Sequence, residues 1–141
     1  SVSREGGQSQ LSAYSELTGP LKLSYSQFEE LELFSRFSTM VDENTKKVFR
    51  RGERIRQTFN QPQFMPMDVT HQIGVFLSLT KGLFDVLDLD QIIEAEKIIM
   101  QVVNEDEALR ENIMANEKLN PKIRESFLET AKEALKQVKP R

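Results

Sequence analysis

The sequence contains no cysteine and only one histidine among its 141 residues. The absence of cysteine excludes disulfides and thiolate chemistry, and it permits a reducing compartment without demonstrating one. The single imidazole, His71, offers no cluster that could hold a metal ion. Its place beside Gln72 in an amphipathic segment is typical of a structural or solvated histidine, so we expect no metal site.

Segments that would signal a membrane, an export route or a phosphate site are missing too. No apolar run approaches the roughly 18 residues that span a bilayer, and no basic-then-apolar signal peptide opens the sequence. No Gly-x-x-x-x-Gly-Lys-Ser/Thr loop occurs to hold phosphates. The net charge of −3 is too small to indicate nucleic acid or an anionic membrane as a partner. We expect a soluble piece with no membrane insertion and no turnover of its own.

Charge is unevenly distributed along the sequence. The segment KKVFRRGERIR, residues 46–56, holds six basic side chains and one acidic side chain. Residues 84–115 hold nine acidic and two basic side chains, and residues 116–141 hold seven basic and four acidic ones. Such blocks most often form solvated faces, and the alternative is a surface that binds an acidic partner.

Helical periodicity dominates the sequence, and the alternation typical of strands is nearly absent. Because proline breaks or kinks a helix, we expect Gly19-Pro20 to separate a short first helix from a long second one. The predicted helices cover residues 8–18, 20–40, 44–60 and 68–80, and three more start at 88 or 90, near 105 and at 121. This pattern predicts an all-α fold, a bundle of about six to seven helices with short connections after an irregular N-terminal loop.

Individual residues suggest where these helices begin and which faces they bury. Suitable N-caps are Asp42 or Asn44, Asp68, and Asn120 followed by Pro121. The buried stripe of the helix 20–40 would comprise Leu21, Tyr25, Phe28, Leu31, Phe34 or Leu33, and Phe37.

The helix 44–60 has a glycine on its expected buried stripe, which comprises Val48, Gly52, Ile55 and Phe59. Gly52 costs about 1 kcal/mol of helix propensity, so it predicts a close neighbour. The opposite, solvated side would carry Lys47, Arg50, Arg51 and Arg54.

Several motifs occur in a fixed order along the sequence. They are SVSR with a glycine pair, Gln-Phe-x-Glu-Leu-Glu-x-Phe-Ser, Arg-Gly-x-Arg, Gln-x-Gln-Phe-x-Pro-Met and Lys-Gly-x-x-Asp. Together they resemble the alpha subunit of rotary (F-type) ATP synthases, from its arginine loop to its C-terminus. The spacing matches over residues 1 to 90, whereas residues 91–141 match in position and length more than in letters. Catalytic beta subunits share the architecture but lack the SVSR loop, which favours alpha.

The resemblance implies two parts: residues 1–7 as a loop left over from the nucleotide-binding domain, and residues 8–141 as the helical C-terminal domain. It implies that Arg4 is an arginine finger that reaches the catalytic site of the neighbouring beta subunit, with Ser1 and Ser3 shaping its loop. Glu5 stands where the family has an apolar residue, and its carboxylate could pair with Arg4. The alternative is that Arg4 is an ordinary surface arginine.

The same resemblance implies a nucleotide contact at Gln61, Pro62 and Gln63. A primary amide offers both the donor and the acceptor that adenine needs, and Pro62 would stiffen the turn. The nucleotide would be ATP or ADP with Mg²⁺ at the non-catalytic site of the full-length parent, and none is expected on this segment alone. The alternative is a proline-rich loop that only joins two helices.

The resemblance also implies partners and a location. The partners would be the beta subunits and the gamma subunit of the central stalk, in a hetero-oligomer peripheral to the membrane. That is the cytoplasmic face in a bacterium, or the matrix or stroma side in an organelle. Two other hypotheses remain: a free-standing helical module that binds an acidic partner through residues 46–56, and a nucleotide-sensing regulator that uses Gln61 and Gln63.

Overall fold

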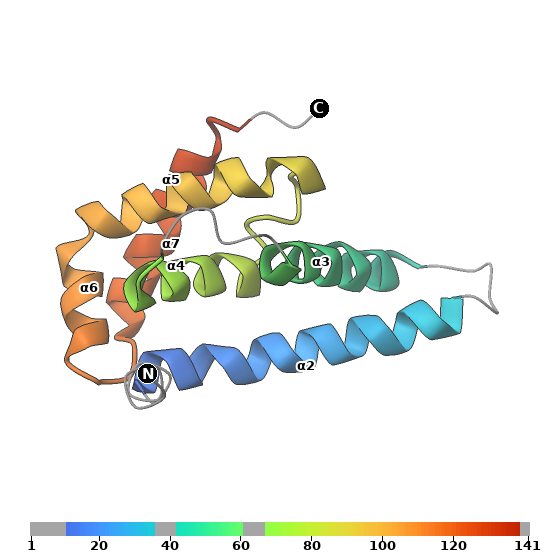
Figure 1. Ribbon diagram of the computed structural model, residues 1–141, viewed down its shortest axis with the longest axis horizontal. Coiled ribbons are helices and arrows are strands. Elements are labelled where there is room, and N and C mark those ends of the chain that lie inside the picture. The colour runs from blue at the N-terminus through green and yellow to red at the C-terminus, as the bar shows by residue number, and fades with distance from the viewer. Residues whose placement is uncertain (1–10, 36–41, 61–66, 139–141) are drawn as a thin grey trace.

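The computed structural model describes residues 11–35, 42–60 and 67–138. Within these ranges the protein forms six α-helices, one 3-10 turn and no strand, which confirms the all-α prediction (Figure 1). The elements are α2 (Ser12–Ser35), α3 (Glu43–Asn60), α4 (Val69–Thr80), η1 (Leu89–Gln91), α5 (Ile92–Glu105), α6 (Glu107–Met114) and α7 (Pro121–Leu135).

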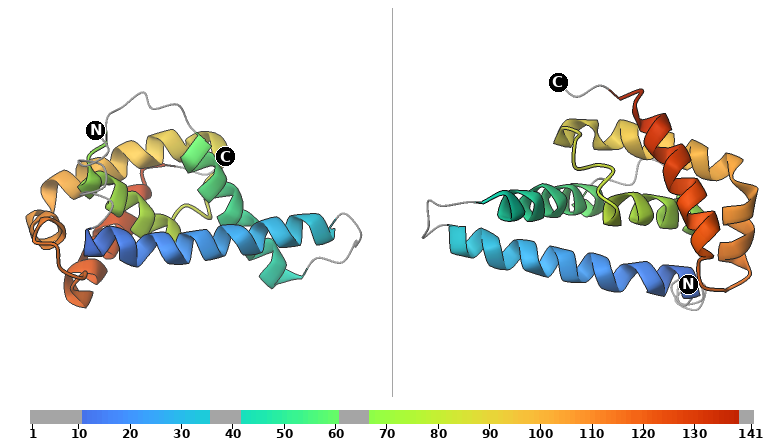
Figure 2. Two further views of the ribbon diagram at one scale, coloured as in Figure 1. Left: turned by 60° about the horizontal axis from the view of Figure 1, so that its bottom comes forward. Right: turned by 180° about the vertical axis from the view of Figure 1, so that it is seen from behind.

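Helix α4 lies at the centre of the molecule and contacts each of the other five α-helices. In Figure 1, α2 runs along the bottom, α3 and α4 follow one another in the middle, and α5 lies above. Helix α7 crosses the bundle on the far side, as the view from behind in Figure 2 shows. Nine of the twelve residues of α4 are buried, which explains its nearly continuous apolar sequence.

The start of α4 is fixed by a reciprocal cap. The Asp68 carboxylate accepts a hydrogen bond from the backbone N–H of His71 at 3.0 Å, and His71 Nδ1 accepts one from the Asp68 N–H at 3.4 Å. Both interactions satisfy donors that a helix start leaves free. His71 Nε2 also lies 2.7 Å from Asn104 Oδ1 near the end of α5. The lone histidine thus joins two helices.

The predicted caps of α3 and α7 are confirmed. Asp42 accepts a hydrogen bond from the Thr45 N–H at 2.8 Å, and Asn120 accepts one from the Lys122 N–H at 2.8 Å, with Pro121 as first helical residue. Helix α6 starts two residues later than expected, because Asp106 is its N-cap.

The predicted break at Gly19-Pro20 is wrong, since α2 continues through both residues. Leu17 and Leu21, one turn apart, are both 4% exposed and lie on one continuous buried face. Pro20 is exposed on the other face. In an ordinary helix, the N–H of residue 20 would donate a hydrogen bond to the carbonyl of Glu16, but proline has no N–H. On the exposed face, water can donate to this carbonyl instead. Burial on one side of α2 therefore outweighs the local preference for a break.

The predicted burial of Leu33 or Phe34 is also wrong, because these side chains are 58% and 63% exposed. A period of 3.6 residues carries the stripe of Leu21 and Phe28 onward to Glu32 rather than to Phe34. Glu32 faces α3, where its carboxylate pairs with Arg56 at 3.0 Å. The far half of α2 therefore contacts α3 through an ion pair. Phe37 lies outside the described residues.

The close neighbour predicted for Gly52 is Phe28 of α2. A Cβ added at Gly52 would overlap the Phe28 ring, whose side chain is only 1% exposed. Phe28 also packs edge-on against Phe49, with ring centroids 5.9 Å apart. The glycine therefore sets how closely α2 and α3 approach. Phe59, at the end of the same predicted stripe, is 57% exposed instead of buried.

Two glycine-to-alanine substitutions should change stability in opposite directions. Gly52→Ala should lower the free energy of unfolding by roughly 1–3 kcal/mol, because the new methyl group displaces Phe28. Gly19→Ala adds a methyl group in the same hairpin with no atom within 4 Å, and should raise it by about 0.5–1 kcal/mol through helix propensity. Urea unfolding followed by circular dichroism measures both. A stabilised Gly52→Ala variant would contradict the close approach.

Candidate functional site

The residues that carry the sequence-based site predictions lie outside the described residues. Ser1, Ser3 and Arg4 precede α2, and Gln61, Pro62 and Gln63 lie between α3 and α4. What the structure describes is the frame around each segment. This frame comprises the first turns of α2, the end of α3 at Asn60 and the start of α4.

The first turns of α2 are anchored to the segment that joins α6 and α7. The Ser12 N–H donates to Asn116 Oδ1 at 3.0 Å, and Asn116 holds a left-handed backbone with φ of 61°. One turn later, the Glu16 carboxylate accepts from the Leu119 N–H at 3.1 Å and pairs with Arg124 at 3.1 Å. The helix that follows Arg4 is therefore joined to a segment about a hundred positions later in the sequence.

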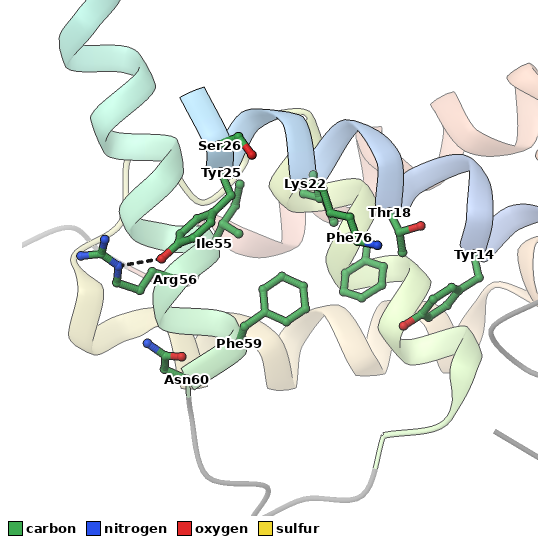
Figure 3. A pocket seen from close by; sticks show the side chains of 11 residues that line it. Tyr14, Thr18, Lys22, Tyr25, Ser26, Ile55, Arg56, Phe59, Asn60 and Phe76 are labelled. Carbon is green, nitrogen blue, oxygen red and sulfur yellow. Dashed lines mark hydrogen bonds between the residues drawn. The ribbon is translucent and has the colours of Figure 1, made fainter. Parts of the chain in front are cut away.

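A groove of about 550 Å³ opens between α2, α3 and α4 and reaches Asn60, directly before the Gln-Pro-Gln segment (Figure 3). We call it the aromatic groove. Its lining contains four aromatic side chains, two cations and no carboxylate: Tyr14, Thr18, Leu21, Lys22, Tyr25, Ser26, Ile55, Arg56, Phe59, Asn60 and Phe76.

Three rings form one wall of this groove. Phe76 of α4 lies between Tyr14 and Phe59, with centroid distances of 5.6 Å and 5.7 Å. Phe76 is 5% exposed, whereas Phe59 presents most of its ring to solvent. An exposed ring packed against a buried one is a surface on which a planar group can stack.

Arg56 closes the other end of the aromatic groove. Its guanidinium donates to Tyr25 Oη at 3.1 Å and to both carboxylate oxygens of Glu32, at 3.0 Å and 3.4 Å. The same group lies 4.6 Å from the centroid of the Phe28 ring. The hydrogen bonds to Glu32 and Tyr25 raise the pKa of Arg56 further above its ordinary value. This cation is thus permanent but already partnered, whereas exposed Lys22 has no ion pair among the described residues.

The basic side chains of residues 46–56 are less available for binding a partner than their number suggests. Arg51 pairs with Asp85 at 3.0 Å and donates to the Thr80 carbonyl at 3.3 Å. Arg54 is 9% exposed and donates through Nε to the Leu87 carbonyl at 3.2 Å. The prediction that Arg54 lies on the solvated side is therefore wrong.

The physical reason is the turn after α4, which covers this side of α3. A buried carbonyl such as that of Leu87 needs a donor, and an arginine on the neighbouring helix supplies it. Because Arg56 is bonded to Glu32, three of the six basic residues act within the fold. For the ion pair between Arg51 and Asp85, the sequence offers one signal. Arg51 begins the Arg-Gly-x-Arg motif and Asp85 ends the Lys-Gly-x-x-Asp motif, and the two side chains meet in the fold.

The family described as ATP synthase alpha/beta chain, C terminal domain, matches residues 10–134. The protein belongs to this family. ATP synthase subunit alpha 2 of Albidiferax ferrireducens is 42% identical over 141 residues, which cover 99% of this sequence and 26% of the relative. ATP synthase subunit alpha 2 of Syntrophus aciditrophicus is 44% identical over 136 residues, 96% of this sequence and 26% of the relative.

ATP synthase subunit alpha 1 of Chlorobium luteolum is 43% identical over 136 residues, which cover 96% of this sequence and 27% of the relative. These relatives are alpha subunits, which confirms the resemblance to alpha. The 141 residues span only about a quarter of the length of the curated relatives that they match.

Within the described parts of this ATP synthase domain, two kinds of feature do not occur. No group of three or more histidine, aspartate or glutamate side chains could hold a metal ion. None of the described helices combines the length and the apolar character that a bilayer crossing needs.

One buried carboxyl group of the domain was not singled out by the sequence. Glu96 of α5 is 5% exposed, and burial raises its pKa from 4.5 to about 7. Above pH 7 the ionised form therefore carries its full desolvation cost in the folded state. As the pH falls toward 4.5 the carboxyl group becomes protonated in the folded state, and the cost disappears.

Glu96→Gln should therefore stabilise the domain in a pH-dependent way. We expect the free energy of unfolding to rise by roughly 1–3 kcal/mol at pH 8, with a gain that shrinks toward pH 5. Glu129→Gln, at an exposed position of α7, should show no such trend. Denaturant unfolding at both pH values measures the difference. A gain independent of pH would contradict the role of ionisation.

Proposed function

We propose that this protein acts as the C-terminal helical domain of the alpha subunit of a rotary, H⁺-transporting ATP synthase. The observation that carries the proposal is the identity of 42% to an alpha subunit over 99% of the sequence. The subunit would be non-catalytic, peripheral to the membrane and assembled with beta subunits and the gamma subunit of the central stalk. The membrane face would be the cytoplasmic one in a bacterium, or the matrix or stroma side in an organelle.

Arg4 would supply the chemistry that this subunit adds to its neighbour. A guanidinium is planar and permanently charged, and it stabilises the charge that spreads over the γ-phosphoryl oxygens during transfer. The hydroxyls of Ser1 and Ser3 can bond the backbone of their loop. Because the start of α2 is anchored at Ser12, the loop that carries Arg4 would move together with the helical bundle. The catalytic step in the neighbouring subunit would then depend on the position of this domain.

Arg4→Lys in a full-length alpha subunit tests this role. Lysine keeps the charge and loses the fork, so multisite ATP turnover of the assembled complex should fall roughly 10³-fold. Nucleotide binding should stay within about twofold of the parent. The matched control is Arg50→Lys on the exposed side of α3, which should leave turnover unchanged. Normal turnover with Arg4→Lys would contradict the proposed role of Arg4 as an arginine finger. It would not affect the assignment of the protein to its family.

Gln61 and Gln63 would contact the adenine of a non-catalytic nucleotide, which carries Mg²⁺ when bound. The described flanks suit such a contact. Asn60 ends α3 on the rim of the aromatic groove, and the cap at Asp68 fixes the start of α4. The segment that carries the two amides thus begins and ends on packed helices, and it begins beside the exposed Phe59 ring.

Replacing both amides should weaken adenine recognition. We expect Gln61→Leu with Gln63→Leu in the full-length subunit to reduce retention of ATP over GTP by about tenfold, because leucine offers neither donor nor acceptor. Gln101→Leu at an exposed position of α5 is the control and should have no effect. Nucleotide content after gel filtration of the complex is the measurement. Unchanged selectivity would mean that the segment only joins two helices.

The bundle would also transmit rotation of the stalk to the nucleotide domains. Contacts of α4 with every other described α-helix support movement of the domain as one packed body, in the manner of rigid domain motion. A free-standing module that binds an acidic partner through residues 46–56 has weaker support, because Arg51, Arg54 and Arg56 are engaged internally.

A further inference from the structure

A second groove, of about 470 Å³, lies between the turn after α4 and the C-terminal end of α7 and shares no lining residue with the aromatic groove. The right view of Figure 2 shows this end of α7 on the face opposite α2. Its floor is apolar: Leu87, Leu135 and Val138 are 2%, 6% and 3% exposed. We call it the lysine-rimmed groove because its lining also includes Lys81, Lys132 and Lys136.

The three lysines make this groove electropositive. Among the described residues, Lys81 and Lys132 form no ion pair, and Lys136 pairs only with Glu133 at 3.3 Å. Both partners of that pair are mostly exposed, at 68% and 75%, so it contributes little. The nearby carboxylate of Asp85 is occupied by Arg51 and is only 14% exposed.

One apolar side chain beside the three lysines is exposed to solvent. Val86 is 71% exposed and lines the groove together with Leu83 and the buried floor. An apolar strip with a polar rim is typical of a surface that another molecule covers. Lysines in the last turn of a helix also interact favourably with its dipole. That effect could account for Lys132 and Lys136 but not for Lys81, which belongs to the turn after α4.

We propose that the lysine-rimmed groove binds an amphipathic helix of a partner protein that carries acidic side chains beside its apolar face. Apolar residues of such a helix would cover Val86 and the floor, and its carboxylates would face the three lysines. Charge complementarity selects an acidic helix over a basic one. The contact requires neither Arg4 nor Gln61 and Gln63, so it is independent of the proposed nucleotide chemistry.

A designed peptide provides the probe. It is a labelled amphipathic helix of about 15 residues with leucines on one face and glutamates along both edges. By fluorescence anisotropy we expect the 141-residue protein to bind it with a Kd on the order of 10 μM at about 50 mM salt. Binding should weaken at about 500 mM salt. The same peptide with lysines in place of glutamates should bind at least about tenfold more weakly.

Matched variants locate the contact. Lys132→Gln with Lys136→Gln should weaken binding by roughly fivefold to tenfold, and Val86→Ser by about threefold. Lys46→Gln with Lys47→Gln removes the same charge from exposed positions of α3 and should leave the Kd unchanged. These positions are all on the surface, and circular dichroism verifies that each variant is folded.

Three results would overturn the proposal. Equal weakening by the α7 and α3 double variants would mean that the peptide is attracted to the charge of the whole molecule. A dimer in sedimentation that is lost with Lys132→Gln and Lys136→Gln would assign the groove to a second copy. Binding to phosphatidylserine vesicles that is lost with the same variants, without peptide binding, would assign it to a membrane surface.

Discussion

The fold depends on one helix, α4, that is buried over most of its surface among the other described helices. The sequence of α4, VTHQIGVFLSLT, contains no Asp, Glu, Lys or Arg, and the helix contacts all five other described α-helices. An element surrounded in this way fixes the positions of α2 on one side and α5 and α7 on the other. It also requires small residues where helices approach, because a Cβ at Gly74 would overlap Val103 of α5. The amphipathic helices around it each need only one apolar face.

The backbone that leaves the enclosed helix α4 turns across α3. This turn explains why Arg51 and Arg54 of α3 are paired within the fold. Gly82 adopts a φ of +76°, which glycine tolerates, and the turn brings the Leu87 carbonyl and Asp85 against the helix. Arg54 and Arg51 then satisfy the carbonyl and the carboxylate. Glu32 and Arg56 form the equivalent link between α2 and α3. Side chains that look like a charged surface in the sequence thus hold the layers together.

The enclosure of α4 and the turn across α3 explain which features of the fold could be predicted from the sequence and which could not. Caps act within one turn, so local sequence is enough to find Asp42, Asp68 and Asn120. Burial depends on which partner a face meets. Pro20 therefore misleads, because the packing that outweighs it comes from the helices that α2 meets in the fold. Arg54 misleads because its partner is a carbonyl 33 positions later in the sequence.

The distribution of unpaired charge follows from the same packing and bears on how the domain meets its surroundings. Arg51, Arg54 and Arg56, half of the cations of residues 46–56, are paired with other parts of the fold. The other three, Lys46, Lys47 and Arg50, are exposed on α3. By contrast, Lys81 and Lys132 come from segments far apart in the sequence and are brought together only by the fold. Composition alone marks the first group, and half of its charges are paired with other residues of the domain. The second group, beside an open apolar floor, has the geometry that binding requires: charge next to apolar surface that none of the described residues covers.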